Sequence, residues 1–178
     1  EALALYSHNT LDVTGLDTNQ EKIISAKKRD LNVSTTDLDK IKENYNFISL
    51  LNVYSHIPNP YEFFSVIKNK LKENGEFLLQ TGHTSHLSNK YHPKPYDLPD
   101  HLSFANKTII ISMLERTGFE IVEVKMYRSP DYPKYYEIIK IIKLFVKILI
   151  RRGEKISHLF PKYPNIDMYI RCRLVGKR

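Results

Sequence analysis

The alternation of helix and strand patterns along the chain predicts a single α/β domain with a mostly parallel sheet. Short apolar strands alternate with capped, amphipathic helices, which is the order of successive βαβ units. The run at residues 45–53 is almost continuously apolar, as expected for a parallel strand that helices cover on both faces. With 178 residues, 42% of them hydrophobic, the chain can bury one substantial core and is too short for two domains.

The N-terminal part is predicted to form a strand, a helix and a second strand. The first strand, at residues 13–16, ends at Asp17, and the second covers residues 31–35. Between them, Thr18 is the predicted N-cap of a helix, because Glu21 stands three residues later and completes a capping box.

The strand at 45–53 is followed by a helix that begins at Pro60 behind the cap Asn59 and ends at Asn74-Gly75. The remaining elements follow in order. They are a strand at 76–81, an irregular stretch at 82–104, a helix at 106–117, a strand at 119–127 and a helix at 135–152.

The last strand is predicted at residues 168–174, where apolar and polar side chains alternate. Met168, Ile170 and Cys172 are separated by Tyr169 and Arg171, a pattern typical of a half-exposed antiparallel strand at a sheet edge. The expected organisation is one domain over residues 1–178, incomplete at its N-terminus, with 128–165 as a helical lid or insertion.

Composition narrows the class of protein further. The net charge is +7, but no zinc-finger spacing or basic groove-reading helix is present, so nucleic acid is not the predicted partner. The one cysteine, Cys172, has no disulfide partner and no metal-ligand cluster, which favours a reducing, cytoplasmic setting and predicts no metal site. No signal-peptide pattern or membrane-length apolar run is found.

Several segments, taken in order, resemble motifs of class I S-adenosylmethionine-dependent methyltransferases that act on small molecules. They are Val13-Thr14-Gly15-Leu16-Asp17, Thr36-Asp37-Leu38, residues 45–60, residues 75–79, and residues 98–104 with the helix and strand that follow them. The resemblance implies a Rossmann-like, doubly wound sheet with an antiparallel C-terminal strand. It also implies methyl transfer from S-adenosylmethionine to an oxygen, nitrogen or carbon of a small-molecule acceptor.

The resemblance assigns cofactor contacts to residues just after strand ends, where open parallel sheets bind ligands. Asp17, with Thr18 beside it, corresponds to the acid that accepts hydrogen bonds from the ribose hydroxyls. Asp37 corresponds to the residue that accepts from the adenine amino group, and the Leu38 amide faces the ring. The remaining two cofactor positions, at the exit of the third strand, are Leu51 and Asn52.

Each assignment has a simpler alternative. Asp17 can be an acid at a helix start, which the helix dipole favours. Asp37 can be a turn former, with Asp39 taking the adenine contact instead. Leu51 and Asn52 can be an ordinary strand end that leads into a capped helix.

Two histidines are the candidate catalytic residues. His56 lies in Tyr54-Ser55-His56-Ile57-Pro58, where the family often has a histidine near the cofactor, and it could orient a substrate or accept a proton. It could equally anchor its loop. His101 is a candidate substrate contact by its Asp100-His101-Leu102 context. His83, His86 and His92 are expected to be solvated loop residues.

The sequence departs from the family pattern at one place. Such a sheet begins with a strand that enters a glycine-rich turn, and the glycines at 15, 75, 82, 118, 153 and 176 do not form that turn. We therefore expect the first strand to lie upstream of Glu1. Two other readings stay open: a non-catalytic Rossmann-like binding module, and a fragment of an NAD-dependent oxidoreductase.

The segment 135–152 carries a basic face and a wide apolar surface. Lys140, Lys143, Lys147 and Arg151 recur at helical spacing among isoleucine, leucine and phenylalanine residues. One interpretation is a lid helix packed on the sheet. The other is a helix that contacts an anionic membrane or a lipid substrate.

Overall fold

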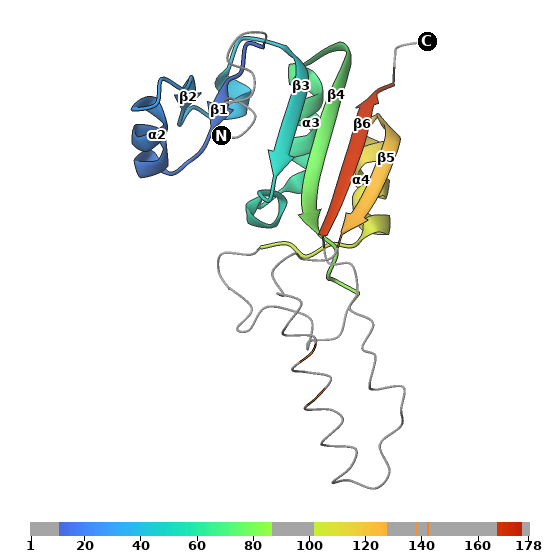
Figure 1. The fold of residues 1–178 in the computed structure, drawn as a ribbon. Coiled ribbons are helices and arrows are strands. Elements are labelled where there is room, and N and C mark those ends of the chain that lie inside the picture. The colour runs from blue at the N-terminus through green and yellow to red at the C-terminus, as the bar shows by residue number, and fades with distance from the viewer. Residues whose placement is uncertain (1–10, 87–101, 128–137, 139–141, 143–166, 176–178) are drawn as a thin grey trace, which may run out of the picture.

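The computed structural model describes residues 11–86, 102–127, 138, 142 and 167–175. Its strands form two sheets (Figure 1). A two-stranded parallel sheet pairs β1 (Gly15–Leu16) with β2 (Val33–Ser34). A four-stranded sheet has the order β3-β4-β6-β5. The predicted α/β class with a mixed, Rossmann-like sheet is confirmed.

The four-stranded sheet is parallel on one side and antiparallel on the other. β3 (Tyr45–Leu51) runs parallel to β4 (Leu71–Gly82). β6 (Asp167–Leu174) runs antiparallel to both β4 and β5 (Phe119–Tyr127). The predicted antiparallel direction of the last strand is confirmed, and the strand lies one place in from the edge, because β5 pairs with its outer side.

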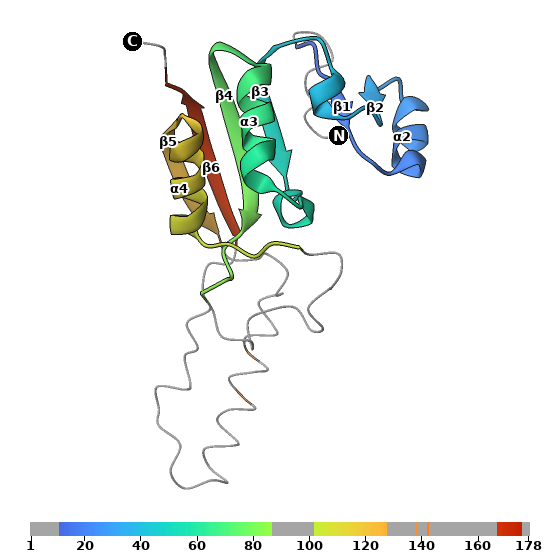
Figure 2. The ribbon, with the colours of Figure 1, turned by 180° about the vertical axis from the view of Figure 1, so that it is seen from behind.

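Two helices cover one face of this sheet, as Figures 1 and 2 show from opposite sides. α3 (Pro60–Lys70) is capped by Asn59, whose side chain accepts from the Glu62 amide, and α4 (Lys107–Thr117) is capped in the same way by Asn106. Gly118 ends α4 in the left-handed conformation at φ 96°, which glycine adopts without strain.

The core lies between these helices and the sheet. The Phe77 ring is 5.9 Å from the Phe64 ring on α3 and 5.7 Å from the Phe119 ring on β5, measured between centroids. Alternation along β6 buries Met168, Ile170 and Cys172, as the sequence pattern predicts. The fully buried side chains are Phe64, Ile67, Phe77, Leu79, Ile110, Leu114, Phe119, Met168, Ile170 and Cys172.

The predicted cap of the first helix is wrong by one residue. α2 spans Gln20–Lys27, and its N-cap is Asn19, whose side chain accepts from the Lys22 amide at 3.1 Å. Thr18 is therefore not the cap. The Asn19 amide donates to Asp17 Oδ1 at 2.8 Å, and this local turn sets the helix start after Asn19.

The predicted end of the second helix is also wrong. α3 ends at Lys70, and Asn74 and Gly75 belong to an irregular part of β4, where the register with β3 jumps. Asn74 has a φ of 57°. Asparagine and glycine favour a helix end and also a strand bulge, because each of these two structures needs a residue with a left-handed backbone.

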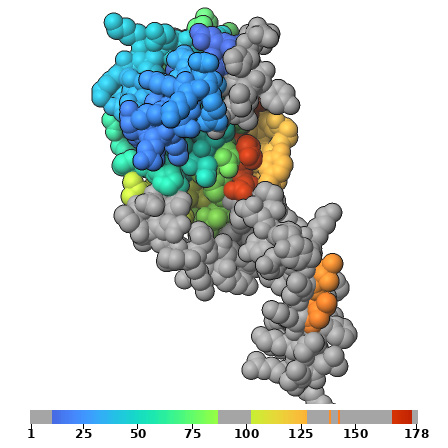
Figure 3. Space-filling view, turned by 60° about the vertical axis from the view of Figure 1, so that its left-hand side comes forward, coloured from blue at the N-terminus to red at the C-terminus, as the bar shows by residue number. Residues whose placement is uncertain are grey.

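The strand predicted at 45–53 ends at Leu51 and is covered by helices on one face only within the described residues. Phe47, Leu51 and Val53 are 43%, 44% and 42% exposed. In the described part of the chain, β3 pairs only with β4, and β1 pairs only with β2. The space-filling view in Figure 3 shows β5 and β6 also reaching the surface.

Most of the predicted insertion at 128–165 lies outside the described residues. Ile138 and Ile142, one turn apart, are helical, and each is 57% exposed. Tyr127 and Asp167, on either side of this connection, are register partners, so the chain leaves and re-enters the sheet at one place. Among the described helices, none is long and apolar enough to cross a membrane.

Candidate functional site

The first candidate group follows the paired strands β1 and β2. The Asp17 amide donates to the Ser34 carbonyl at 3.3 Å, which extends the pairing of the two strands to the predicted ribose-binding residue. Asp17 Oδ1 accepts from the Asn19 amide, and Oδ2 lies 3.6 Å from Lys22 Nζ. The carboxylate is therefore fixed in orientation, while its second oxygen has only a loose, exposed ion pair. Thr18 next to it is exposed.

The predicted adenine contact has a local partner too. Asp37 precedes the short 3-10 helix η1 (Leu38–Lys40), and its Oδ2 lies 2.5 Å from Lys40 Nζ. Both side chains are exposed, and the Asp37 carboxylate raises the pKa of Lys40 by hydrogen bonding and by charge. Leu38 packs against the core and holds this turn in place.

The second candidate group lies at the exit of β3. Asn52 follows the strand with a φ of 58°, a left-handed conformation that is strained for most residues and milder for asparagine. Its amide donates to the Gln80 carbonyl of β4 at 3.1 Å. The chain therefore turns sharply at the carboxyl end of a parallel strand, where open sheets bind ligands.

Backbone hydrogen bonds tie this exit to two other segments. The Ser55 carbonyl, in the 3-10 helix η2 (Tyr54–His56), accepts from the amides of Leu102 at 2.7 Å and Ser103 at 3.1 Å. The Ala105 carbonyl accepts from the amides of Thr84 and Ser85, both at 3.2 Å. Residues 52–56, 82–85 and 102–105 thus form one connected rim at the carboxyl ends of β3 and β4.

His83 belongs to this rim, although the sequence predicts an ordinary solvated loop residue there. It is partly buried, and its Nδ1 accepts from the Lys107 amide, the first residue of α4, at 2.9 Å. The His86 ring is 4.2 Å away. Burial lowers the pKa of His83, and the positive charges of His86 and Lys107 lower this pKa further. The signal that reveals His83 is a contact across 24 positions, which local sequence patterns cannot show.

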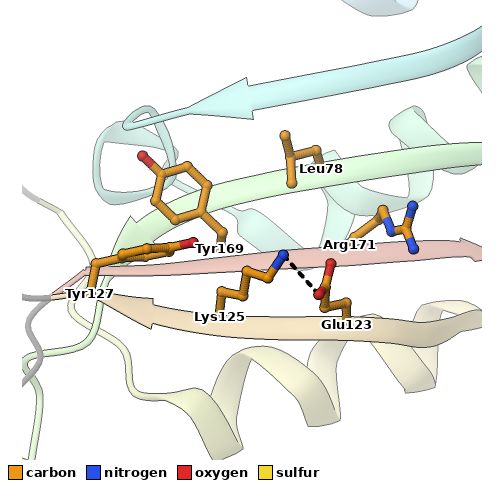
Figure 4. A pocket seen from close by; sticks show the side chains of 6 residues that line it. All are labelled: Leu78, Glu123, Lys125, Tyr127, Tyr169 and Arg171. Atoms are coloured by element: carbon orange, nitrogen blue, oxygen red, sulfur yellow. Dashed lines mark ion pairs between the residues drawn. The ribbon is translucent and has the colours of Figure 1, made fainter.

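An open depression of about 180 Å³ lies on the face of the sheet away from α3 and α4 (Figure 4). Tyr127 and Tyr169 meet edge to face at 5.3 Å, and Lys125 pairs with Glu123 at 2.9 Å. The depression is lined by Leu78, Glu123, Lys125, Tyr127, Tyr169 and Arg171. No sequence-predicted site residue lines it.

The structure therefore brings the predicted residues together in two groups. Asp17, Thr18, Asp37 and Leu38 follow the neighbouring strands β1 and β2, whereas Leu51 is the last residue of β3 and Asn52 and His56 follow it. His101 lies outside the described residues. The described glycines form no glycine-rich turn, since they lie in β1, in β4 and at the end of α4. Among the described residues, no cluster could hold a metal ion.

The acids and the strained turn lie at the carboxyl ends of parallel strands, which is where open α/β sheets bind their ligands. Comparison with known proteins identifies the family. The sequence model of the methyltransferase domain matches residues 1–124. The chain belongs to this methyltransferase family, as predicted, and the expected enzyme class, a methyltransferase, is confirmed.

Solved structures share the fold. A SAM-dependent methyltransferase from Archaeoglobus fulgidus is 17% identical, with a TM-score of 0.65, and the match covers 97% of this chain and 80% of that one. The [4+2]-cyclase SpnF is also 17% identical, with a TM-score of 0.62 and coverages of 97% and 70%. The plantazolicin methyltransferase BpumL, solved with a triazolic substrate analog and SAH, is 15% identical, with a TM-score of 0.59 and coverages of 97% and 71%. A search of curated proteins finds no match.

Proposed function

We propose that the chain transfers a methyl group from S-adenosylmethionine to a small-molecule acceptor, with the cofactor at the ends of β1, β2 and β3. The observation that carries this proposal is the fixed carboxylate of Asp17, a residue whose backbone amide extends the β1–β2 pairing within a methyltransferase-family sheet. Its less engaged oxygen, Oδ2, is suited to accept from ribose hydroxyls.

The other predicted cofactor residues contact other parts of the cofactor in this proposal. Asp37 and the Leu38 amide face the adenine, and Leu51 and Asn52 contact the methionine part. The residues fit such a ligand, because each lies at or just after a strand end, where the chain presents an acid, a backbone amide or a strained polar turn. When bound, the cofactor supplies an electrophilic methyl group on a sulfonium, so the protein's task is alignment and exclusion of water.

The proposed acceptor side contains His56 and His101, which would orient the acceptor or take its proton if the reaction requires this. The Ser55 carbonyl, which binds the amides of Leu102 and Ser103, supports the placement of both segments in one site. The proposed acceptor is methylated on an oxygen, a nitrogen or a carbon atom.

Calorimetric titration tests this function. The chain is titrated with S-adenosylhomocysteine, with NAD and with adenosine, and we expect saturable binding of S-adenosylhomocysteine that is tighter than binding of the other two. Tighter binding of NAD would support the oxidoreductase alternative instead. Saturation with none of the three would support a non-catalytic binding module. The cyclase among the structural neighbours shows that the fold name alone does not fix the reaction.

We also propose that residues 1–178 form one domain, with 128–165 as a helical lid or insertion whose segment 135–152 contacts lipid or an anionic membrane surface. The register pair Tyr127–Asp167 supports an insertion, and the exposed Ile138 and Ile142 support an apolar contact. Sedimentation with phosphatidylglycerol vesicles should carry the chain down, whereas an Ile138→Glu, Ile142→Glu variant should stay in the supernatant. Equal sedimentation of both would refute the contact.

A cytoplasmic location is proposed from the buried, unpaired Cys172 and can be tested by cell fractionation.

A further inference from the structure

The hydrogen bond between His83 and α4 fixes which nitrogen of this imidazole carries the proton. Nδ1 accepts from the Lys107 amide at 2.9 Å, so Nδ1 cannot itself be protonated while this bond exists. In the neutral ring the proton must then sit on Nε2. His83 is therefore held as a hydrogen-bond donor at Nε2, and not as a base.

The surroundings keep this donor neutral and rigid. Burial, the His86 ring and the Lys107 ammonium all lower the pKa of His83. The bonds from Thr84 and Ser85 to the Ala105 carbonyl fix the loop that follows β4.

The electrostatic environment also selects the kind of acceptor. Both neighbours of the ring carry basic side chains, because Lys107 supplies the amide that binds Nδ1 and the His86 ring lies 4.2 Å away between centroids. An oxyanion that approaches Nε2 is therefore attracted, while an ammonium group is repelled. This position is at the carboxyl end of β4, on the rim that includes the exit of β3.

We propose that His83 is an acceptor-binding residue whose Nε2–H donates a hydrogen bond to an anionic oxygen, such as a carboxylate, of the methyl acceptor. This inference rests on the proposed methyltransferase function. It names a class of acceptor, small organic acids, and a residue outside the predicted pair His56 and His101.

Two substitutions separate a binding role from a structural one. In His83→Asn the side-chain oxygen can still accept from the Lys107 amide, but no donor remains at the position of Nε2. In His83→Gln the amide nitrogen can take the place of Nε2. Benzoate is the probe, and benzylamine, which has the same ring and the opposite charge, is its control.

Dissociation constants are measured calorimetrically, with S-adenosylhomocysteine present. We expect wild type to bind benzoate more tightly than benzylamine, His83→Asn to lose roughly tenfold or more in benzoate affinity, and His83→Gln to retain most of it. All three proteins should bind S-adenosylhomocysteine equally and melt at similar temperatures. Failure of wild type to bind benzoate, or equal binding by wild type and His83→Asn, overturns the inference.

Failure of the proposed function gives a different result, namely no binding of S-adenosylhomocysteine to wild type. In that case benzoate titrated alone still reports on His83. Nitrogen-15 NMR of wild type adds a readout that needs no variant. We expect a protonated Nε2 and an unprotonated Nδ1 for His83 at neutral pH, and the opposite tautomer would overturn the inference.

Discussion

The two left-handed asparagines, Asn52 and Asn74, give a matched test of strain against function. Their φ angles are 58° and 57°, so the backbone cost is nearly the same at both positions. Asn52 lies at the proposed cofactor site, whereas Asn74 lies in the irregular part of β4. Substitutions that act only through the backbone should therefore have equal effects at the two positions.

The expected size of the stability effect follows from this geometry. Alanine in a left-handed conformation costs about 1–2 kcal/mol, so Asn52→Ala and Asn74→Ala should each lower the melting temperature by roughly 2–8 °C. Glycine removes the strain but adds about 0.5–1 kcal/mol of chain entropy, so both glycine variants should lie close to wild type. Thermal unfolding followed by circular dichroism measures all four.

Cofactor affinity should then separate the two positions. Asn52→Gly loses a side chain that the proposal places against the methionine part of the cofactor, which costs about 0.5–3 kcal/mol depending on the charge of its partner. We expect Asn52→Gly to bind S-adenosylhomocysteine roughly tenfold more weakly and Asn74→Gly to bind it like wild type. Equal affinity in the two glycine variants would show that Asn52 serves only the turn.

Three further predictions concern other parts of the molecule. Asp17→Asn keeps an acceptor for the Asn19 amide but removes the negative charge. The melting temperature should therefore stay the same, while affinity for S-adenosylhomocysteine falls about ten- to hundredfold. Asp12→Asn, which changes an exposed acid, is the control, and equal affinity of the two variants would contradict the ribose role of Asp17. Replacement of residues 128–166 by a short turn makes the connection between β5 and β6 roughly tenfold shorter. The lower entropy cost of closing this loop should stabilise the β5–β6 pair by about 2 kcal/mol, and affinity for the cofactor should stay unchanged. Loss of folding in this variant would refute the prediction that the segment is an insertion. Burial raises the pKa of the Cys172 thiol to about 12, so the folded chain should resist iodoacetamide at pH 8 and react only when unfolded; rapid labelling would contradict this.

The pH dependence of stability has a definite sign at His83. Its folded-state pKa is lowered, mainly by burial, so the unfolded chain binds this proton more readily. The folded state therefore loses stability as the pH falls below the ordinary histidine range. His83→Asn, which cannot be protonated, should show a smaller loss between neutral and mildly acidic pH in urea unfolding.

Sequence patterns predict the bounds of a helix or strand best where its start and end signals have no competitor nearby. β5 is predicted at 119–127 and observed at Phe119–Tyr127, because Gly118 ends the preceding helix and no competing turn residue follows. α4 is predicted equally well from Asn106 and Gly118. The alternation along β6 likewise fixes which side chains are buried.

The errors arise where two positions offer the same local chemistry. Thr18 and Asn19 are both good caps, and only the bond from the Asn19 amide to Asp17 decides between them. Asn74-Gly75 signals a left-handed turn, which the sequence places at a helix end and the structure places within β4. Neither choice can be made from propensity alone, because each depends on a tertiary partner.

The candidate site is predictable in part for the same reason. Asp17, Asp37 and Asn52 can be proposed from the sequence because strand ends are visible in local patterns and a family resemblance names these positions. His83 is missed because its partner Lys107 lies on a different element, and a histidine in an irregular stretch has no period. The direction of its hydrogen bond exists only in the folded chain.

The most direct test of the account is the position of the cofactor on the chain. Backbone amide shifts are recorded by NMR while S-adenosylhomocysteine is added. We expect the largest changes at residues 17–18, 37–38 and 51–52, with little change at Tyr127 and Tyr169 in the open depression. Changes confined to the depression, or no saturable change at any of the strand ends, would contradict it.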